Sequence, residues 1–195
     1  EEENPKEWEA GKRSVSVPFY GFQHVDLVTG HGDECGGDYA RWLRAQRPDA
    51  EKLRDHRNQL PHNYTCPQAI RTALPEELYP TAFIRDRAVD YLRGASKADP
   101  FFLMVSFPDP HHPFTAPGKY WDMYKPEDMP VPAAYTRKDW KPSPFVQRLT
   151  EARESGKSKG EGQAAFAVSQ KETLEARALT LGMIAFIDDA IGEVL

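Results

Sequence analysis

The sequence has little cysteine and no long apolar run. Its 195 residues include only two cysteines, Cys35 and Cys66, which is too few for a disulfide framework and leaves one disulfide or two free thiols open. The most apolar run, Phe101 to Phe107, is far shorter than the roughly 20 residues that cross a membrane. We therefore expect no membrane segment, and the sequence leaves the localisation undetermined.

An excess of basic residues is also missing. The net charge is -5, which argues against a nucleic-acid-binding scaffold. An anionic substrate stays possible, because a few focused donors can outweigh the overall charge. The acidic start, Glu1 to Glu3, is no signal peptide. The chain opens without Met, and an apolar helical pattern still runs at Leu195, so we expect an excerpt of a longer protein.

What is present is typical of an ordinary globular protein, with 39% hydrophobic and 28% charged residues. Aromatic and β-branched residues predict a strand over Phe19 to Val28, followed by a turn at Gly30-His31-Gly32-Asp33. The pattern then predicts a short helix over Asp38 to Gln46, with Asp38 as its N-cap. Residues 51–80 are predicted to be mostly loop.

The middle of the chain has the pattern of an α/β protein. Helical spacing predicts a helix over Thr81 to Ala95, capped by Thr81. The residues expected on its buried face are Ile84, Ala88, Tyr91, Leu92 and Ala95. After Pro100, the continuous apolar run Phe101 to Phe107 predicts a strand buried on both faces, as in a parallel sheet covered by helices. The fold class we expect is therefore α/β.

Proline then dominates residues 108–144, which excludes a long helix or a central strand there. We expect a surface loop that aromatic side chains pin to the body: Tyr120, Trp121, Tyr124 and Trp140. Residues 155–163 are glycine-rich and charged, typical of a mobile loop. Thr173 to Leu195 is predicted to be a long, deeply buried helix.

The strongest candidate site is the histidine pair His111 and His112. It follows the predicted strand directly, and ligands of open α/β sheets bind at the carboxyl ends of strands. Neighbouring residues of an extended segment point in opposite directions, so we expect one of the two histidines to face the crevice. A solvated loop histidine is the plain alternative. A metal site with Asp109 is a weaker one, because adjacent histidines do not easily share one metal and no HxxxH spacing occurs.

The segment PFFLMVSFPDPHHPFTAPGKYWDMYKPEDMPVP, residues 100–132, closely resembles part of the type I sulfatases, in which a strand leads into Pro-His-x-Pro-Phe and a Pro-Gly-Lys-Tyr-like loop. The flanks are similar as well. They are residues 20–25 with 30–33 and the Tyr39-x-x-Trp42-Leu43 stretch, the helix at 81–88, and the IDDAIGxVL pattern at 187–195. The resemblance covers nearly the whole chain, apart from the first residues and 155–170, and identifies residues 1–195 as the middle portion of a sulfatase catalytic domain, truncated at both ends.

This resemblance implies part of an alkaline-phosphatase-like sheet flanked by helices, with a long Pro-rich loop. It implies hydrolysis of a small-molecule or carbohydrate sulfate ester by a formylglycine nucleophile, with calcium or another divalent cation. The family's catalytic histidine falls on His111, where it would contact the sulfate group; a preorganised donor at an anionic oxygen lowers the barrier. His112 takes the variable position.

The nucleophile motif Cys/Ser-x-Pro-x-Arg does not occur in the sequence. Cys66 lies in Cys-Pro-Gln-Ala-Ile-Arg, which is out of register, so we read it as a structural cysteine and expect the nucleophile and the metal ligands to lie outside this chain. Asp188 and Asp189 are read as helix-face residues. We therefore expect the 195 residues alone to be inactive.

Substrate contacts are assigned more loosely to His112, His31 and Lys119. A plain turn in which Asp33 accepts backbone N–H bonds is the alternative for His31 and its neighbours. Trp121 is favoured as a loop anchor over a substrate contact. Two alternatives for the activity stay open: a phosphonate or phosphodiester hydrolase of the same superfamily, and a non-catalytic binder of sulfated glycans.

Overall fold

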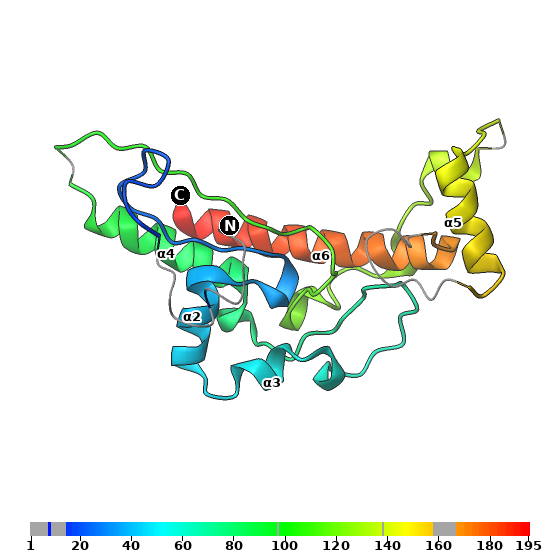
Figure 1. The fold of residues 1–195 in the computed structure, drawn as a ribbon, viewed down its shortest axis with the longest axis horizontal. Helices are drawn as coiled ribbons and strands as arrows, with labels where there is room; N and C mark the ends of the chain where they lie inside the picture. Colours follow the sequence, from blue (N-terminus) through cyan, green and yellow to red (C-terminus); the bar gives the residue numbers. More distant parts are fainter. Residues whose placement is uncertain (1–7, 9–14, 97, 138, 158–166) are drawn as a thin grey trace.

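The computed structural model describes residue 8 and residues 15–96, 98–137, 139–157 and 167–195. Five α-helices organise these residues: α2 (Gly37–Gln46), α3 (Ala50–Arg54), α4 (Pro80–Gly94), α5 (Pro144–Glu154) and α6 (Gln170–Val194). Helix α6 runs along the long axis of the molecule, α4 packs against it, and α5 lies at the opposite end from α4 (Figure 1). Short 3-10 turns connect these helices: η1 (Gly32–Glu34), η2 (His56–Asn58), η3 (Glu76–Leu78), η4 (Gly118–Tyr120), η5 (Pro126–Asp128) and η6 (Ala133–Thr136).

The predicted α/β fold is wrong for this structure, because the described residues contain no strand and no sheet; their β-structure consists of two isolated bridges. Phe101 to Phe107 is extended but pairs with no neighbouring strand among the described segments. Its side chains alternate, with Leu103 and Val105 half-buried and Phe102 77% exposed. An apolar run indicates burial but does not say whether a pairing partner exists, which is where the prediction failed.

The strand predicted over Phe19 to Val28 is wrong for the same reason. Phe19 and Phe22 exchange backbone hydrogen bonds in a tight turn. The rest of the segment reaches α2 instead of a strand: the Leu27 N–H donates to the Asp38 carboxylate (2.8 Å), and the Asp38 N–H donates to the Leu27 carbonyl (2.7 Å). The Asp38 carboxylate therefore binds the backbone of Leu27. The prediction that Asp38 caps α2 is wrong, because the N-cap is Gly36.

The two long helices are confirmed, but the deep burial predicted for the second is wrong, since Ile184 and Ile191 of α6 are 43% and 41% exposed. Helix α4 starts one residue earlier than predicted, with Tyr79 as N-cap and Pro80 at its first position, where a missing N–H costs nothing. Thr81 does not cap it. Ile84 and Ala88 of the predicted face are buried. Helix α6 begins with a capping box, in which Ser169 and Glu172 satisfy each other's backbone N–H groups.

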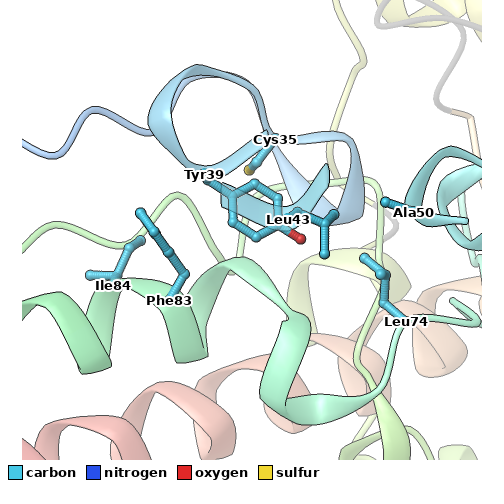
Figure 2. Packing of buried hydrophobic residues seen from close by; sticks show 7 residues of the cluster. All are labelled: Cys35, Tyr39, Leu43, Ala50, Leu74, Phe83 and Ile84. Carbon is cyan, nitrogen blue, oxygen red and sulfur yellow. The ribbon is translucent and has the colours of Figure 1, made fainter. Parts of the chain in front are cut away.

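The core consists of three clusters of buried side chains. The first joins α2 to α4, and its members are Cys35, Tyr39, Leu43, Ala50, Leu74, Phe83 and Ile84 (Figure 2). The second joins the start of α4 to α6 through Tyr79, Tyr120 and Phe186. The third places Cys66 and Trp121 against Leu179 of α6. Helix α6 is thus the surface on which two of the three clusters assemble.

The Pro-rich segment lies on this surface as expected, although not every aromatic residue anchors it. Tyr120 and Trp121 are buried, whereas Trp140 is 54% exposed. Gly182 of α6 allows the close approach, because a Cβ added there would lie 2.2 Å from the Tyr120 carbonyl oxygen. The predicted mobile loop at 155–163 falls largely outside the described residues.

Candidate functional site

Two loops that are far apart in the sequence meet around the predicted histidines. We call residues 29–36 and 108–115 the histidine loops. Gly32 has a positive φ of 56°, and a Cβ at this position would lie 2.8 Å from the Thr115 Oγ1 and 3.1 Å from the Pro113 Cγ. The second loop is also tied to residues 68–70, since the Phe114 N–H donates to the Gln68 carbonyl (2.8 Å). Gly32 therefore packs closely against the side chains of Pro113 and Thr115, and the second loop is also held to residues 68–70.

The rings of His31 and His111 stack, with centroids 3.7 Å apart and planes inclined by 19°. The ring of His112 lies beside that of His111, with centroids 4.1 Å apart. The chain turns at residues 109–113 instead of extending, so the expectation that the neighbouring histidines point apart is not met. His31 and His111 are both exposed. The structure thus brings together three of the four predicted site residues.

The orientation of His111 is set by its own backbone. Its Nδ1 lies 2.5 Å from the carbonyl oxygen of His112. A carbonyl can only accept, so this nitrogen carries the hydrogen. The Nε2 is left as the atom that accepts a proton or, in the charged imidazolium, donates a second hydrogen bond. An imidazole fixed in this way is suited to contact an anionic oxygen.

Asp109 and Thr115 of the second histidine loop form a buried polar group with Tyr79, the N-cap of α4. The Tyr79 hydroxyl donates to the Asp109 Oδ2 (2.9 Å) and lies 2.7 Å from the Thr115 Oγ1. Burial, opposed by the hydrogen bond from Tyr79 and the charge of His111 and assisted by the neighbouring Asp33, raises the pKa of Asp109 to about 7. The carboxyl therefore changes charge near neutral pH.

A second polar group supports the first histidine loop. The buried Asp33 contacts His56 (Oδ1 to Nε2, 3.1 Å), and this hydrogen bond raises the pKa of His56. Arg54 donates to the backbone carbonyls of Asp33 and Cys35, at 2.8 Å each. Among the described residues, the Asp33 side chain thus hydrogen-bonds to His56, and not to the backbone N–H groups of the plain-turn alternative.

Lys119 does not belong to this group. It lines a hollow of about 500 Å³ between η3, η4 and α6, whose other charged residues include Arg85, Asp189 and Glu193. Its Nζ lies 3.3 Å from the Asp189 carboxylate, and its backbone N–H donates to Glu76. None of the residues lining this hollow belongs to the histidine loops.

A largely apolar groove of about 520 Å³ begins at the histidine loops. His31 and Pro108 line one part of it, and residues 19–30, α4 and the extended segment 103–106 line the rest. Its apolar side chains include Leu27, Val28, Ile84, Leu103 and Val105. His31, whose ring stacks on that of His111, therefore lines a hollow with apolar walls, which suits the non-ionic part of a ligand.

Cys66 and the two aspartates of α6 have structural surroundings. Cys66 is a free, buried cysteine whose pKa is raised to about 12 by burial and by Glu175, so it stays a thiol and is no nucleophile at neutral pH. Asp188 and Asp189 are exposed on α6, and Asp189 accepts from Tyr120 and Lys119. These positions agree with the interpretation of Cys66 as a structural cysteine and of Asp188 and Asp189 as helix-face residues.

The described residues do not fit a metal centre. Among them, no three His, Cys, Asp or Glu side chains are grouped so that they could hold a metal ion. Nor is any helix in the described ranges long and apolar enough to span a bilayer.

Sequence reasoning missed Tyr79 and His56, and it considered Asp109 only as a metal ligand. Tyr79 and His56 lie 30 and 23 residues from the carboxylates they contact. No local pattern links residues at such separations. The Pro that follows Tyr79 predicts a helix start, but it does not indicate where the hydroxyl points.

Comparison with known proteins places this arrangement in a family. The chain is 30% identical over 165 residues to an arylsulfatase of Clostridium perfringens, a match that covers 84% of this chain and 31% of that protein. It is 34% identical over 124 residues to PehA of Trinickia caryophylli, described as a multifunctional alkaline phosphatase superfamily protein, with 62% of this chain and 24% of that protein covered. The chain thus spans about a third of the first relative and a quarter of the second.

A shorter match, 50% identical over 42 residues, is to YidJ, an uncharacterised sulfatase of Escherichia coli K12, and covers 21% of this chain and 8% of that protein. The family model described as Sulfatase matches residues 33–195. This range contains all of the second histidine loop and residues 33–36 of the first, and it begins two residues after His31. The chain belongs to the sulfatase family.

Proposed function

We propose that these 195 residues are the middle portion of a sulfatase catalytic domain and that the whole protein hydrolyses sulfate esters. The observation that supports this most is the His31–His111 stack at 3.7 Å, within a chain matched by the Sulfatase model over residues 33–195. The substrate would be a small-molecule or carbohydrate sulfate ester, and the isolated chain would be inactive.

In this proposal, His111 contacts the sulfuryl oxygens or the leaving oxygen. Its Nδ1–H is engaged by the His112 carbonyl, so Nε2 would be the atom that meets the substrate. An imidazolium at this position would stabilise negative charge as it develops, and removing such a donor typically costs ~100-fold or more in turnover. His31 would support the His111 ring by stacking, and His112 would contribute mainly its carbonyl.

A formylglycine nucleophile and a divalent cation belong to the resemblance; the sequence lacks the motif of the first, and the described part of the chain does not fit the second. The motif Cys/Ser-x-Pro-x-Arg is absent from the sequence, and the described residues offer no ligand group for a metal. We therefore assign no step of the reaction to them here. Lys119, which lines the other hollow, is no longer proposed as a substrate contact.

The test compares three substrates with the full-length protein: 4-nitrophenyl sulfate, bis-4-nitrophenyl phosphate and a phenyl phosphonate ester. We expect the sulfate ester to have the largest kcat/KM. A larger kcat/KM for either phosphorus ester would favour the alternative, a phosphonate or phosphodiester hydrolase, which the similarity to a multifunctional alkaline phosphatase superfamily protein keeps in view. Binding of a sulfated sugar without turnover of any ester would favour the non-catalytic binder.

A further inference from the structure

A carboxyl group with one hydrogen bond lies directly beneath the candidate site. Asp109 is 6% exposed and precedes His111 by two residues. Its Oδ2 accepts from Tyr79, while its Oδ1 is buried and has no hydrogen-bond partner among the described residues. A carboxylate offers about four acceptor sites, and burying a charge without compensation is expensive. The group is therefore poorly built as a permanent anion, and its raised pKa agrees with this.

The Tyr79 hydroxyl joins this carboxyl to Thr115, at the other end of the second histidine loop. It lies between Asp109 and Thr115, and Tyr79 itself is completely buried at the start of α4. The Thr115 Oγ1 lies against Gly32, next to His31. The Tyr79 hydroxyl thus connects the start of α4 to the second histidine loop. Through Thr115, it also adjoins Gly32 of the first histidine loop.

The charged and titratable groups that act on Asp109 come from each of these elements: Tyr79 from the start of α4, Asp33 from the first histidine loop and His111 from its own loop. The charge of Asp109 also helps to raise the pKa of Cys35 on the first histidine loop, where burial is the larger cause. When Asp109 holds a proton, the carboxyl can donate to the Tyr79 oxygen, and the Tyr79 hydroxyl can then donate to Thr115. The chain of hydrogen bonds is complete in this neutral form.

We infer that Asp109 is a positioning residue for His111: through Tyr79 and Thr115 it fixes the turn that aims the imidazole, without touching the substrate itself. This inference rests on the proposed function, in which His111 contacts the sulfuryl group. It adds Asp109 and Tyr79 to the residues on which turnover depends. The neutral carboxyl, and not the carboxylate, is the form that holds the turn.

The experiment measures kcat and KM of the full-length protein on 4-nitrophenyl sulfate for Asp109→Ala, Asp109→Asn and Tyr79→Phe. Loss of an outer residue that orients a catalytic group typically costs ~10–100-fold, and we expect Asp109→Ala to lose this in kcat with little change in KM. Asp109→Asn should recover most of it, because its uncharged amide can donate to the Tyr79 oxygen as the protonated carboxyl does. Tyr79→Phe should lose about as much as Asp109→Ala, since both break the same link.

Tyr39→Phe is the matched control. Tyr39 is also completely buried, and its hydroxyl donates to the Leu78 carbonyl (2.8 Å). Removing this hydroxyl should lower stability to a similar degree while leaving kcat within about twofold. A second readout is the ¹³Cε1 NMR signal of the histidines: Asp109→Ala and Tyr79→Phe should move the signals of His111 and His31 and leave that of His62 in place.

Unchanged kcat in Asp109→Ala, together with a large loss in His111→Ala, would overturn the inference and leave the proposed function standing. An Asn variant no better than the Ala variant would also overturn it. If His111→Ala is itself nearly as active as the wild type, the proposed function fails, and an unmoved His111 signal in Asp109→Ala would then overturn the positioning role separately. Should Asp109→Ala not fold, Tyr79→Phe decides, and an unchanged kcat in this variant contradicts the inference.

Discussion

Two buried carboxyl groups, Glu175 and Asp109, are held in opposite ways. Glu175 of α6 is 2% exposed, and its Oε2 accepts from the backbone N–H groups of Thr65 (2.9 Å) and Cys66 (2.7 Å), while Lys171 lies 3.4 Å from its Oε1. Asp109 is almost as buried but accepts one hydrogen bond, at Oδ2, and its Oδ1 has no hydrogen-bond partner among the described residues. Glu175, with several donors around it, ties residues 65–66 to α6. Asp109, with one donor, has a raised pKa, so its charge depends on pH near neutrality.

The largest stability effect should come from the Glu175 side of this comparison. Glu175→Ala leaves the buried Cys66 N–H without an acceptor, and each unsatisfied buried donor costs about 1–3 kcal/mol. We expect the free energy of unfolding of the full-length protein, measured in urea, to fall by about 3 kcal/mol. Turnover per folded molecule should stay near wild type. Glu175→Gln, which keeps one acceptor oxygen, should lose less, and a large loss of turnover in either variant would show that the Glu175 region is not merely structural.

Gly32→Ala tests the contact between the histidine loops. The added Cβ meets the Thr115 Oγ1 at 2.8 Å, and the φ of +56° is unfavourable for alanine, so we expect a loss of about 1–3 kcal/mol in stability together with reduced turnover. Gly21→Ala is the control, since Gly21 also has a positive φ (+93°) but nothing lies within 4 Å of an added Cβ. It should cost about 1 kcal/mol or less and leave turnover unchanged. Equal turnover in the two variants would show that activity does not depend on the contact between the histidine loops.

Asp109→Asn should change how the free energy of unfolding depends on pH. The folded pKa of about 7 lies above the ordinary value of 3.8, so between these pH values the folded state holds a proton that the unfolded state has released. Stability from this group therefore falls as pH rises from about 4 to about 7. Relative to the wild type, Asp109→Asn should gain stability across this window. Asp49→Asn, at an exposed aspartate paired with Arg47, should show no such gain, and parallel pH curves for wild type and Asp109→Asn would contradict the account.

The smallest effect is expected at Cys66. Its thiol donates to the Pro67 carbonyl, a bond that serine can keep, so Cys66→Ser should cost about 1 kcal/mol or less. Turnover of the full-length protein on 4-nitrophenyl sulfate should be unchanged. Complete loss of activity with a normally folded protein would show that Cys66 takes part in the chemistry, against both the sequence and its burial.

The sequence predicted the parts of the fold that local spacing controls. Helix α4 and helix α6 follow from apolar spacing, but the capping box of Ser169 and Glu172, which starts α6 before the predicted Thr173, was not predicted. The strand at Phe101 to Phe107 was wrong, because pairing depends on a partner segment that a local pattern cannot show. The predicted sheet with flanking helices failed with it.

For the site, the resemblance and the strand-end position directed attention to His111, and the turn at His31 was noted as a second candidate. That the two rings stack could not be predicted, because they are 80 positions apart and meet only through contacts such as Gly32 with Thr115. Lys119 was placed with them from the sequence alone, but it contacts Glu76 and Asp189 instead.

The most direct test of the central claim is kcat/KM of the full-length protein on 4-nitrophenyl sulfate for His111→Ala beside His112→Ala. The two histidines are adjacent, and their rings lie 4.1 Å apart, so each is a control for the other. The account predicts a loss of ~100-fold or more for His111→Ala and a far smaller loss for His112→Ala. A His111→Ala variant within a few-fold of the wild type, or a larger loss in His112→Ala, would contradict it.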